Sequence, residues 1–131
     1  MIFVDTGAWF AAFVPNDAHH AAAKAWLDTN EQPLLTTDYV LDELLTLLRI
    51  RGEQSRAFIL GDQILTEAIV SLHLVTIREI QLAFDVYRRF DDKEWSFTDC
   101  VSRIVMEELQ IHAAFAFDNH FRQFGTVTVV P

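Results

Sequence analysis

The sequence holds few of the residues that cross-link or interrupt a chain. It has one cysteine, four glycines and three prolines in 131 residues. A lone Cys100 can form neither an internal disulfide nor a thiolate metal cage, which excludes disulfide scaffolds and zinc fingers and favours a reducing cytoplasm. So little Gly and Pro leaves no material for linkers, and no repeat is present. We therefore expect one domain over residues 1–131.

Long apolar runs and a basic leader are absent as well. No stretch approaches the ~20 apolar residues of a membrane span. The chain reaches Asp5 without the pattern of a secretory or transit signal. The sequence thus predicts a soluble, cytoplasmic protein.

Positive charge is scarce. Ten Lys and Arg stand against 19 Asp and Glu, a net charge of −9, which argues against a broad electrostatic surface for nucleic acid. Carboxylates that converge on divalent cations would invert the local field, however. The net charge therefore does not exclude a nucleic-acid substrate.

The apolar residues, 51% of the chain, fall into two alternating patterns. Short apolar runs predict five buried strands, at Ile2–Val4, Leu34–Thr36, Leu72–Thr76, Ala113–Phe117 and Thr126–Val130. Helical spacing predicts six helices between them, at Ala8–Val14, Asp17–Asn30, Asp38–Arg51, Gln54–Ile69, Ile77–Phe90 and Phe97–Gln110. We expect Asp17, Asp38 and Ser96 to cap three of these helices. Buried strands that alternate with helices are typical of an α/β fold with a parallel sheet covered on both faces.

Four carboxylates follow the predicted strands. Asp5 and Asp118 come directly after two of them, Asp99 lies in the first turn of the helix that Ser96 opens, and Glu43 lies in the second turn of the helix after the second strand. Ligands of parallel sheets gather beyond the carboxyl ends of the strands, so we expect these acids to meet on one rim. Mg²⁺ and Mn²⁺ prefer oxygen ligands, and one or two such ions activate water in phosphodiester cleavage. The pattern predicts a metal-dependent hydrolase of phosphodiesters.

Four short motifs resemble those of a known family. They are Val4-Asp5-Thr6-Gly7-Ala8-Trp9, Asp38-Tyr39-Val40-Leu41-Asp42-Glu43-Leu44, Ser96-Phe97-Thr98-Asp99-Cys100 and Phe117-Asp118-Asn119-His120-Phe121. In order and spacing, over essentially the whole chain, they look like a PIN-domain ribonuclease, and more narrowly like the VapC toxins of toxin–antitoxin pairs. Gly7 stands where Ser or Asn is frequent in the family, and Asn119 where a charged residue is common.

The resemblance implies a three-layer α/β/α sandwich around a mainly parallel five-stranded sheet, with an acidic pocket for one or two Mg²⁺ or Mn²⁺ ions. It implies endonucleolytic hydrolysis of RNA, a cognate antitoxin that blocks the site, and a homodimer. By the family pattern six residues form the site: Asp5 and Asp99 as direct metal ligands, Glu43 and Asp118 to hold or orient metal and water, and Thr6 and Ser96 as hydroxyls beside the acids.

Structural interpretations of these residues stay open. Asp5 and Asp118 also suit turns at strand ends, and Asp99 three residues after Ser96 also suits a capping box. Asp42 competes with Glu43 as the helix acid. Trp9 and Phe13, at helical spacing, are core residues, dimer contacts or a stacking platform for bases.

Two basic groups of the sequence also have alternative roles. His120, two residues after Asp118, is a substrate contact or a loop residue. Arg88 and Arg89 suit the negative end of a helix dipole or an RNA phosphate.

Two further functions are alternatives to catalysis on RNA. One is a catalytically silent PIN-like module that binds RNA or protein. The other is a phosphoacceptor receiver-like signalling domain, which needs a lysine after a late strand. The two lysines, Lys24 and Lys93, follow none of the predicted strands, which argues against that function.

Overall fold

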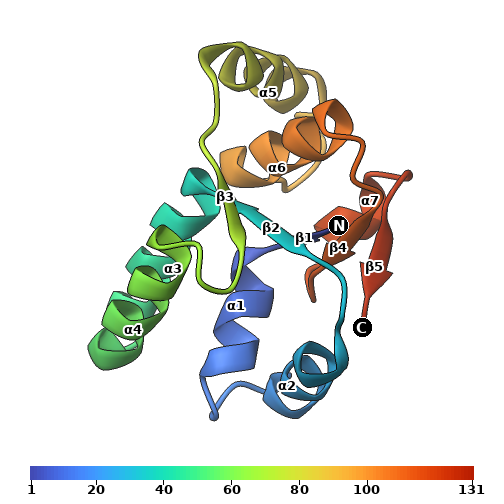
Figure 1. The fold of residues 1–131 in the computed structure, drawn as a ribbon. Helices are drawn as coiled ribbons and strands as arrows, with labels where there is room; N and C mark the ends of the chain where they lie inside the picture. The colour runs from blue at the N-terminus through green and yellow to red at the C-terminus, as the bar shows by residue number, and fades with distance from the viewer.

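Five short strands form the centre of the fold (Figure 1). The computed structural model describes residues 1–131. Its strands are β1 (Ile2–Val4), β2 (Leu34–Thr37), β3 (Ser71–His73), β4 (Ala113–Phe115) and β5 (Thr128–Val130). They lie in the order β3-β2-β1-β4-β5, and all four pairings are parallel. The predicted α/β class is confirmed, and the sheet is parallel throughout.

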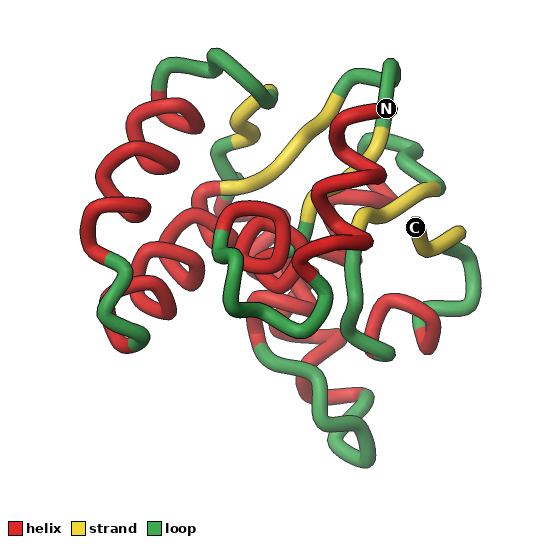
Figure 2. Tube along the Cα trace, turned by 90° about the horizontal axis from the view of Figure 1, so that it is seen from below, coloured by secondary structure: helices red, strands yellow, loops and turns green.

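Seven helices surround this sheet. They are α1 (Thr6–Phe13), α2 (His20–Thr29), α3 (Asp38–Ile50), α4 (Gln54–Leu65), α5 (Ile77–Arg89), α6 (Phe97–Glu108) and α7 (His120–Gln123). Figure 1 shows α1 and α2 on one side of the sheet and α6 on the other, with α5 outside α6. Figure 2 shows how short the strands are among these helices. None of the helices is long and apolar enough to cross a lipid bilayer.

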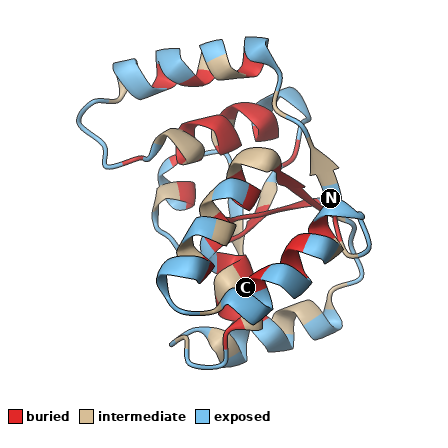
Figure 3. Ribbon diagram, turned by 90° about the vertical axis from the view of Figure 1, so that its left-hand side faces the viewer, coloured by how far each residue is buried: buried red, intermediate tan, exposed pale blue.

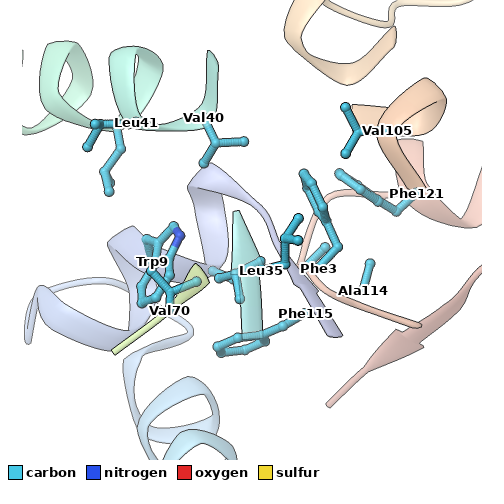
Figure 4. Close-up of a cluster of buried hydrophobic side chains, with 14 of the residues drawn as sticks. Phe3, Trp9, Leu35, Val40, Leu41, Val70, Val105, Ala114, Phe115 and Phe121 are labelled. Carbon is cyan, nitrogen blue, oxygen red and sulfur yellow. The ribbon is translucent and has the colours of Figure 1, made fainter. Parts of the chain in front are cut away.

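Buried aromatic side chains pack both faces of the sheet. Phe3 points to the α7 side, where its ring centre lies 6.0 Å from that of Phe121 (Figure 4). Phe115 packs on the other side, 4.3 Å from Trp26 of α2. In Figure 3 the buried residues of the helices face inward and the exposed residues face outward. The two faces together form one continuous core.

Trp9 belongs to this core and is fully buried. Its indole N–H donates to Thr36 Oγ1 at 3.4 Å, and that hydroxyl donates to the Val4 carbonyl at 3.0 Å. The polar end of the indole is therefore satisfied inside the protein. A stacking platform for bases at Trp9 is excluded.

Two of the three predicted helix caps are wrong. Thr37 caps α3, because its Oγ1 accepts from the Val40 N–H at 3.1 Å. Asp38 instead accepts from the Val75 N–H at 3.0 Å and so joins the start of α3 to the loop after β3. Asp17 accepts from the His19 N–H, and α2 begins only at His20.

The predicted limits of several elements also shift. The strand predicted at Leu72–Thr76 ends at His73, because Thr76 caps α5 in a capping box with Glu79. The helix predicted at Gln54–Ile69 ends at Leu65, and Glu67 then takes a positive φ of 56°. The sequence analysis did not predict α7. This one-turn helix, of four residues, is too short for an apolar period to show.

Candidate active site at the carboxyl ends of the strands

Asp5 lies at the centre of the sheet's carboxyl edge. Its N–H donates to the Phe115 carbonyl at 3.1 Å, which extends the β1–β4 pairing by one residue, and its backbone then starts α1 as the N-cap. The side chain is 5% exposed. The Asp5 carboxylate therefore lies where β1, β4 and α1 meet, nearly excluded from water.

Asp99 reaches the same edge from α6. The Asp99 N–H donates to Ser96 Oγ, and the Ser96 N–H donates to Asp99 Oδ2, both at 3.0 Å. The predicted Ser96 cap is confirmed, and so is the capping-box interpretation of Asp99. The cap holds the Asp99 carboxylate at this edge through Oδ2. Because Oδ1 takes no part in the cap, that oxygen stays available to bind a cation.

Asp118 and Glu43 complete the group at its outer side. Asp118 is exposed and follows β4, and its Oδ1 accepts from the His120 N–H at 2.9 Å. Glu43 is half-buried on α3. Asp42 is exposed and lines a hollow between α3 and α4 with Leu45 and Phe58. Glu43, not Asp42, is the acid of α3 that faces the group.

Burial and the negative charges of the other three acids raise the pKa of Asp5. Burial, followed by the negative charge of Asp99, raises the pKa of the Asp5 carboxyl to about 8, and the charges of Glu43 and Asp118 add to this. Only the neighbouring Thr6 backbone N–H acts in the opposite direction. Without a cation, Asp5 therefore holds a proton at neutral pH. The four carboxylates that the sequence placed on one rim do converge around it.

Comparison with models of protein families matches residues 2–127 to the PIN domain. The chain belongs to the PIN-domain family. This PIN-domain protein is 36% identical to the 23S rRNA-specific endonuclease VapC20 of Mycobacterium tuberculosis, over 100% of the chain and 99% of the relative. It is 30% identical to a VapC ribonuclease of Archaeoglobus fulgidus, over 90% of the chain and 77% of the relative.

Solved structures agree with this assignment. The crystal structure of Mycobacterium tuberculosis VapC20, a Sarcin-Ricin loop cleaving toxin, superposes with a TM-score of 0.92 at 34% identity and covers 100% of both chains. FitAcB from Neisseria gonorrhoeae superposes with a TM-score of 0.70 at 14% identity, over 100% of this chain and 97% of the other, and so shares the fold. The predicted family, fold and nuclease class are confirmed. The receiver-like alternative is wrong.

The site of this PIN-domain protein suits a hard cation in its donor chemistry. Its donors are carboxylate and hydroxyl oxygens, and Thr6 Oγ1 is buried with no hydrogen-bond partner. Protonated Asp5 and the free Oδ1 of Asp99 are further unused oxygens. No three His, Cys, Asp or Glu side chains lie close enough together to hold a metal ion by themselves. An open set of a few carboxylates is how proteins hold Mg²⁺, since water and substrate complete its shell.

Two features lie next to the acids but outside the six predicted site residues, and for one of them, His120, the sequence had left open a substrate contact or a loop position. His120 Nδ1 lies 2.7 Å from Asp99 Oδ2 and 3.3 Å from Asp118 Oδ1. Its position two residues after Asp118 was the available signal, but the contact with Asp99 depends on the undetected α7. The second feature is a row of aromatic side chains.

The aromatic row leads away from the acids toward solvent. Ring centres lie 6.1 Å apart for Tyr39 and Phe97, 5.8 Å for Phe97 and Tyr87, and 6.5 Å for Tyr87 and Phe84. Tyr39 is four residues before Glu43 on α3, on the same face of that helix, so the row begins near the acids. At its outer end the Arg88 guanidinium lies 4.8 Å from the Phe84 ring centre.

Proposed function

We propose that this PIN-domain protein is a Mg²⁺- or Mn²⁺-dependent endoribonuclease and the toxin of a toxin–antitoxin pair. The observation that carries the proposal is the convergence of Glu43, Asp99 and Asp118 on the buried Asp5. Burial and the repulsion among the four carboxylates are strong enough that Asp5 keeps a proton at neutral pH. A bound cation would remove this repulsion and stabilise the ionised form of Asp5. The names of the relatives, an rRNA endonuclease and a ribonuclease, support RNA as the substrate.

The six site residues divide by exposure. Asp5 and Asp99, both nearly buried, would hold the cation directly, and Asp5 releases its proton when it does so. Glu43 and Asp118 are more exposed and would bind or orient the cation and the attacking water. Thr6 Oγ1, buried and unpartnered, is an auxiliary oxygen, and Ser96 keeps Asp99 in place.

Hydrolysis by this site needs no nucleophilic side chain. A bound divalent ion supplies acidification of water and charge stabilisation on the attacking and leaving oxygens. Water then attacks phosphorus in line with the departing 3′ oxygen of the RNA. Asp5 is buried and Asp118 is exposed, so substrate would reach the site from the side of Asp118.

We infer that the substrate enters along the aromatic row. Bases of single-stranded RNA stack on aromatic rings, and such loops are where proteins read RNA sequence. The row of Tyr39, Phe97, Tyr87 and Phe84 offers such rings without a basic surface, which fits the net charge of −9. A loop of structured RNA, as in the Sarcin-Ricin loop named for VapC20, is the kind of substrate that this surface suits.

The proposed partners follow from the family. A cognate antitoxin would block the acidic site, two copies would form a homodimer, and the 131 residues would act as one domain in the cytoplasm, where RNA and antitoxin are present. The similarity to the VapC relatives supports these proposals over the full length of the chain.

Cleavage of total cellular RNA tests the function. The purified protein is incubated with RNA in Mg²⁺, in Mn²⁺ and in EDTA, beside the Asp99→Asn and Asp42→Asn variants. We expect discrete fragments from the wild type and from Asp42→Asn with metal, and none in EDTA or from Asp99→Asn. Intact RNA under all conditions, with RNA still bound, would instead identify a catalytically silent binding module.

A further inference from the structure

We propose that His120 is a positioning residue of the metal site, whose Nδ1–H donates to Asp99 Oδ2, close to Asp118 Oδ1, and so turns Asp99 Oδ1 toward the cation. The inference rests on the proposed function and assigns a new residue to it. It depends on the distances of 2.7 Å and 3.3 Å from Nδ1 to these two oxygens.

The hydrogen bonds around Asp99 leave one oxygen free. Oδ2 accepts both from the Ser96 N–H and from His120 Nδ1. The partner of Nδ1 is a carboxylate oxygen, which can only accept, so Nδ1 carries the proton. Two donors on Oδ2 fix the rotation of the carboxylate about its bond to Cβ. Oδ1 keeps its lone pairs for a cation, with no hydrogen bond to displace.

The same histidine also holds Asp118, through its backbone. The His120 backbone N–H donates to Asp118 Oδ1 at 2.9 Å, and Nδ1 lies 3.3 Å from that oxygen. Asp118 is otherwise exposed, with 45% of its side chain accessible. Repulsion between Asp99 and Asp118 would separate these carboxylates, whereas His120 keeps them together because its Nδ1–H donates to Asp99 and its backbone N–H donates to Asp118.

The ring of His120 is not what anchors α7. Phe121 is fully buried, with its ring centre 6.0 Å from that of Phe3 and 5.0 Å from that of Phe124. The side chain of His120 is 23% exposed. Removal of the imidazole should therefore leave the fold intact while it takes away one of the two donors to Asp99 Oδ2.

The test measures Mn²⁺ binding directly by isothermal titration calorimetry, without RNA. The variants are His120→Ala, His120→Asn and His120→Gln, with His112→Ala as the control because His112 is exposed in the loop before β4. Asn places an amide N–H near the position of Nδ1, whereas Gln places it near Nε2. Partners that hold metal ligands in place are worth about 10–100-fold in metal affinity.

We expect His120→Ala and His120→Gln to lose about 10–100-fold in Mn²⁺ affinity, with His120→Asn and His112→Ala close to wild type. Unchanged affinity in His120→Ala, or rescue by Gln but not by Asn, would overturn the inference. Should His120→Ala fail to fold, the comparison of Asn with Gln decides alone. RNA cleavage by the wild type is measured in parallel. Metal-dependent cleavage with an unaffected His120→Ala refutes only this inference, whereas a wild type that neither binds Mn²⁺ nor cleaves refutes the proposed function as well.

Discussion

Asp5 should make the metal-free protein less stable as the pH rises. Its folded pKa is raised from 3.8 to about 8, so the folded state binds a proton that the unfolded state has already released. The contribution of Asp5 to stability is therefore highest below about pH 4, falls between pH 4 and pH 8, and levels off above that range. Replacement by Asn removes the ionisation and keeps the size of the side chain.

The size of the effect follows from the pKa shift. A pH of 7 is about three units above the pKa of the Asp5 carboxyl in the unfolded chain. Each pKa unit corresponds to about 1.4 kcal/mol, so ionisation of Asp5 favours the unfolded state by about 4 kcal/mol. Asp5 is 5% exposed, so solvent screens little of this. We expect Asp5→Asn to gain stability on the order of 4 kcal/mol at pH 7, and to gain almost none near pH 4.

Urea denaturation in EDTA, at several values between pH 4 and pH 8.5, measures this difference. Asp42→Asn is the matched control, because Asp42 is exposed on the same rim helix as Glu43, and its effect should stay within about 0.5 kcal/mol at every pH. Added Mn²⁺ should reverse the order, since a cation bound only to the folded wild type stabilises it. A gain from Asp5→Asn that is absent at pH 7, or that does not change with pH, would refute the electrostatic argument.

Two further outcomes are expected. Tyr87→Ala should weaken RNA binding in a fluorescence titration by about 1–3 kcal/mol, the value of one stacked base. Phe58 is 63% exposed on α4, away from the aromatic row, so Phe58→Ala should have no effect in the same titration. Unchanged RNA affinity together with a smaller oligomer would instead make the aromatic row a subunit contact. Burial opposes ionisation of Glu79, but hydrogen bonds from Thr76 and His73 outweigh it and lower its pKa, so its stabilisation is present at neutral pH and is lost as the pH falls through that lowered value. Glu79→Gln should thus cost about 1 kcal/mol at pH 7 and less in acid, and a cost in thermal unfolding that does not change with pH would contradict this.

The fold was predictable because the two central strands are apolar along their whole length. Ile2–Val4, Ala114 and Phe115 are buried within the parallel sheet, so each strand shows as a short apolar run. The acids that follow such runs share an edge by topology alone. Asp5 and Asp118 were therefore predictable as neighbours although 112 residues separate them in the sequence.

The features that could not be predicted from the sequence depend on contacts between segments far apart in the chain. Thr37 and Asp38 are both residue types that cap helices. Thr37 caps α3 because the Asp38 carboxylate instead accepts a hydrogen bond from the N–H of the distant Val75. The contact of His120 with Asp99 spans 21 residues and requires α7, which is one turn long. No local pattern encodes either pairing.

The ends of the RNA fragments test the central claim most directly. Attack by water with departure of the 3′ oxygen leaves a 5′-phosphate and a 3′-hydroxyl, whereas attack by the 2′-hydroxyl, as a histidine could promote, leaves a 2′,3′-cyclic phosphate and a 5′-hydroxyl. Ligation-based end mapping distinguishes the two. We predict 5′-phosphate ends that are absent in EDTA and from Asp99→Asn. Cyclic phosphate ends that form in EDTA would contradict metal-dependent hydrolysis at the acidic rim.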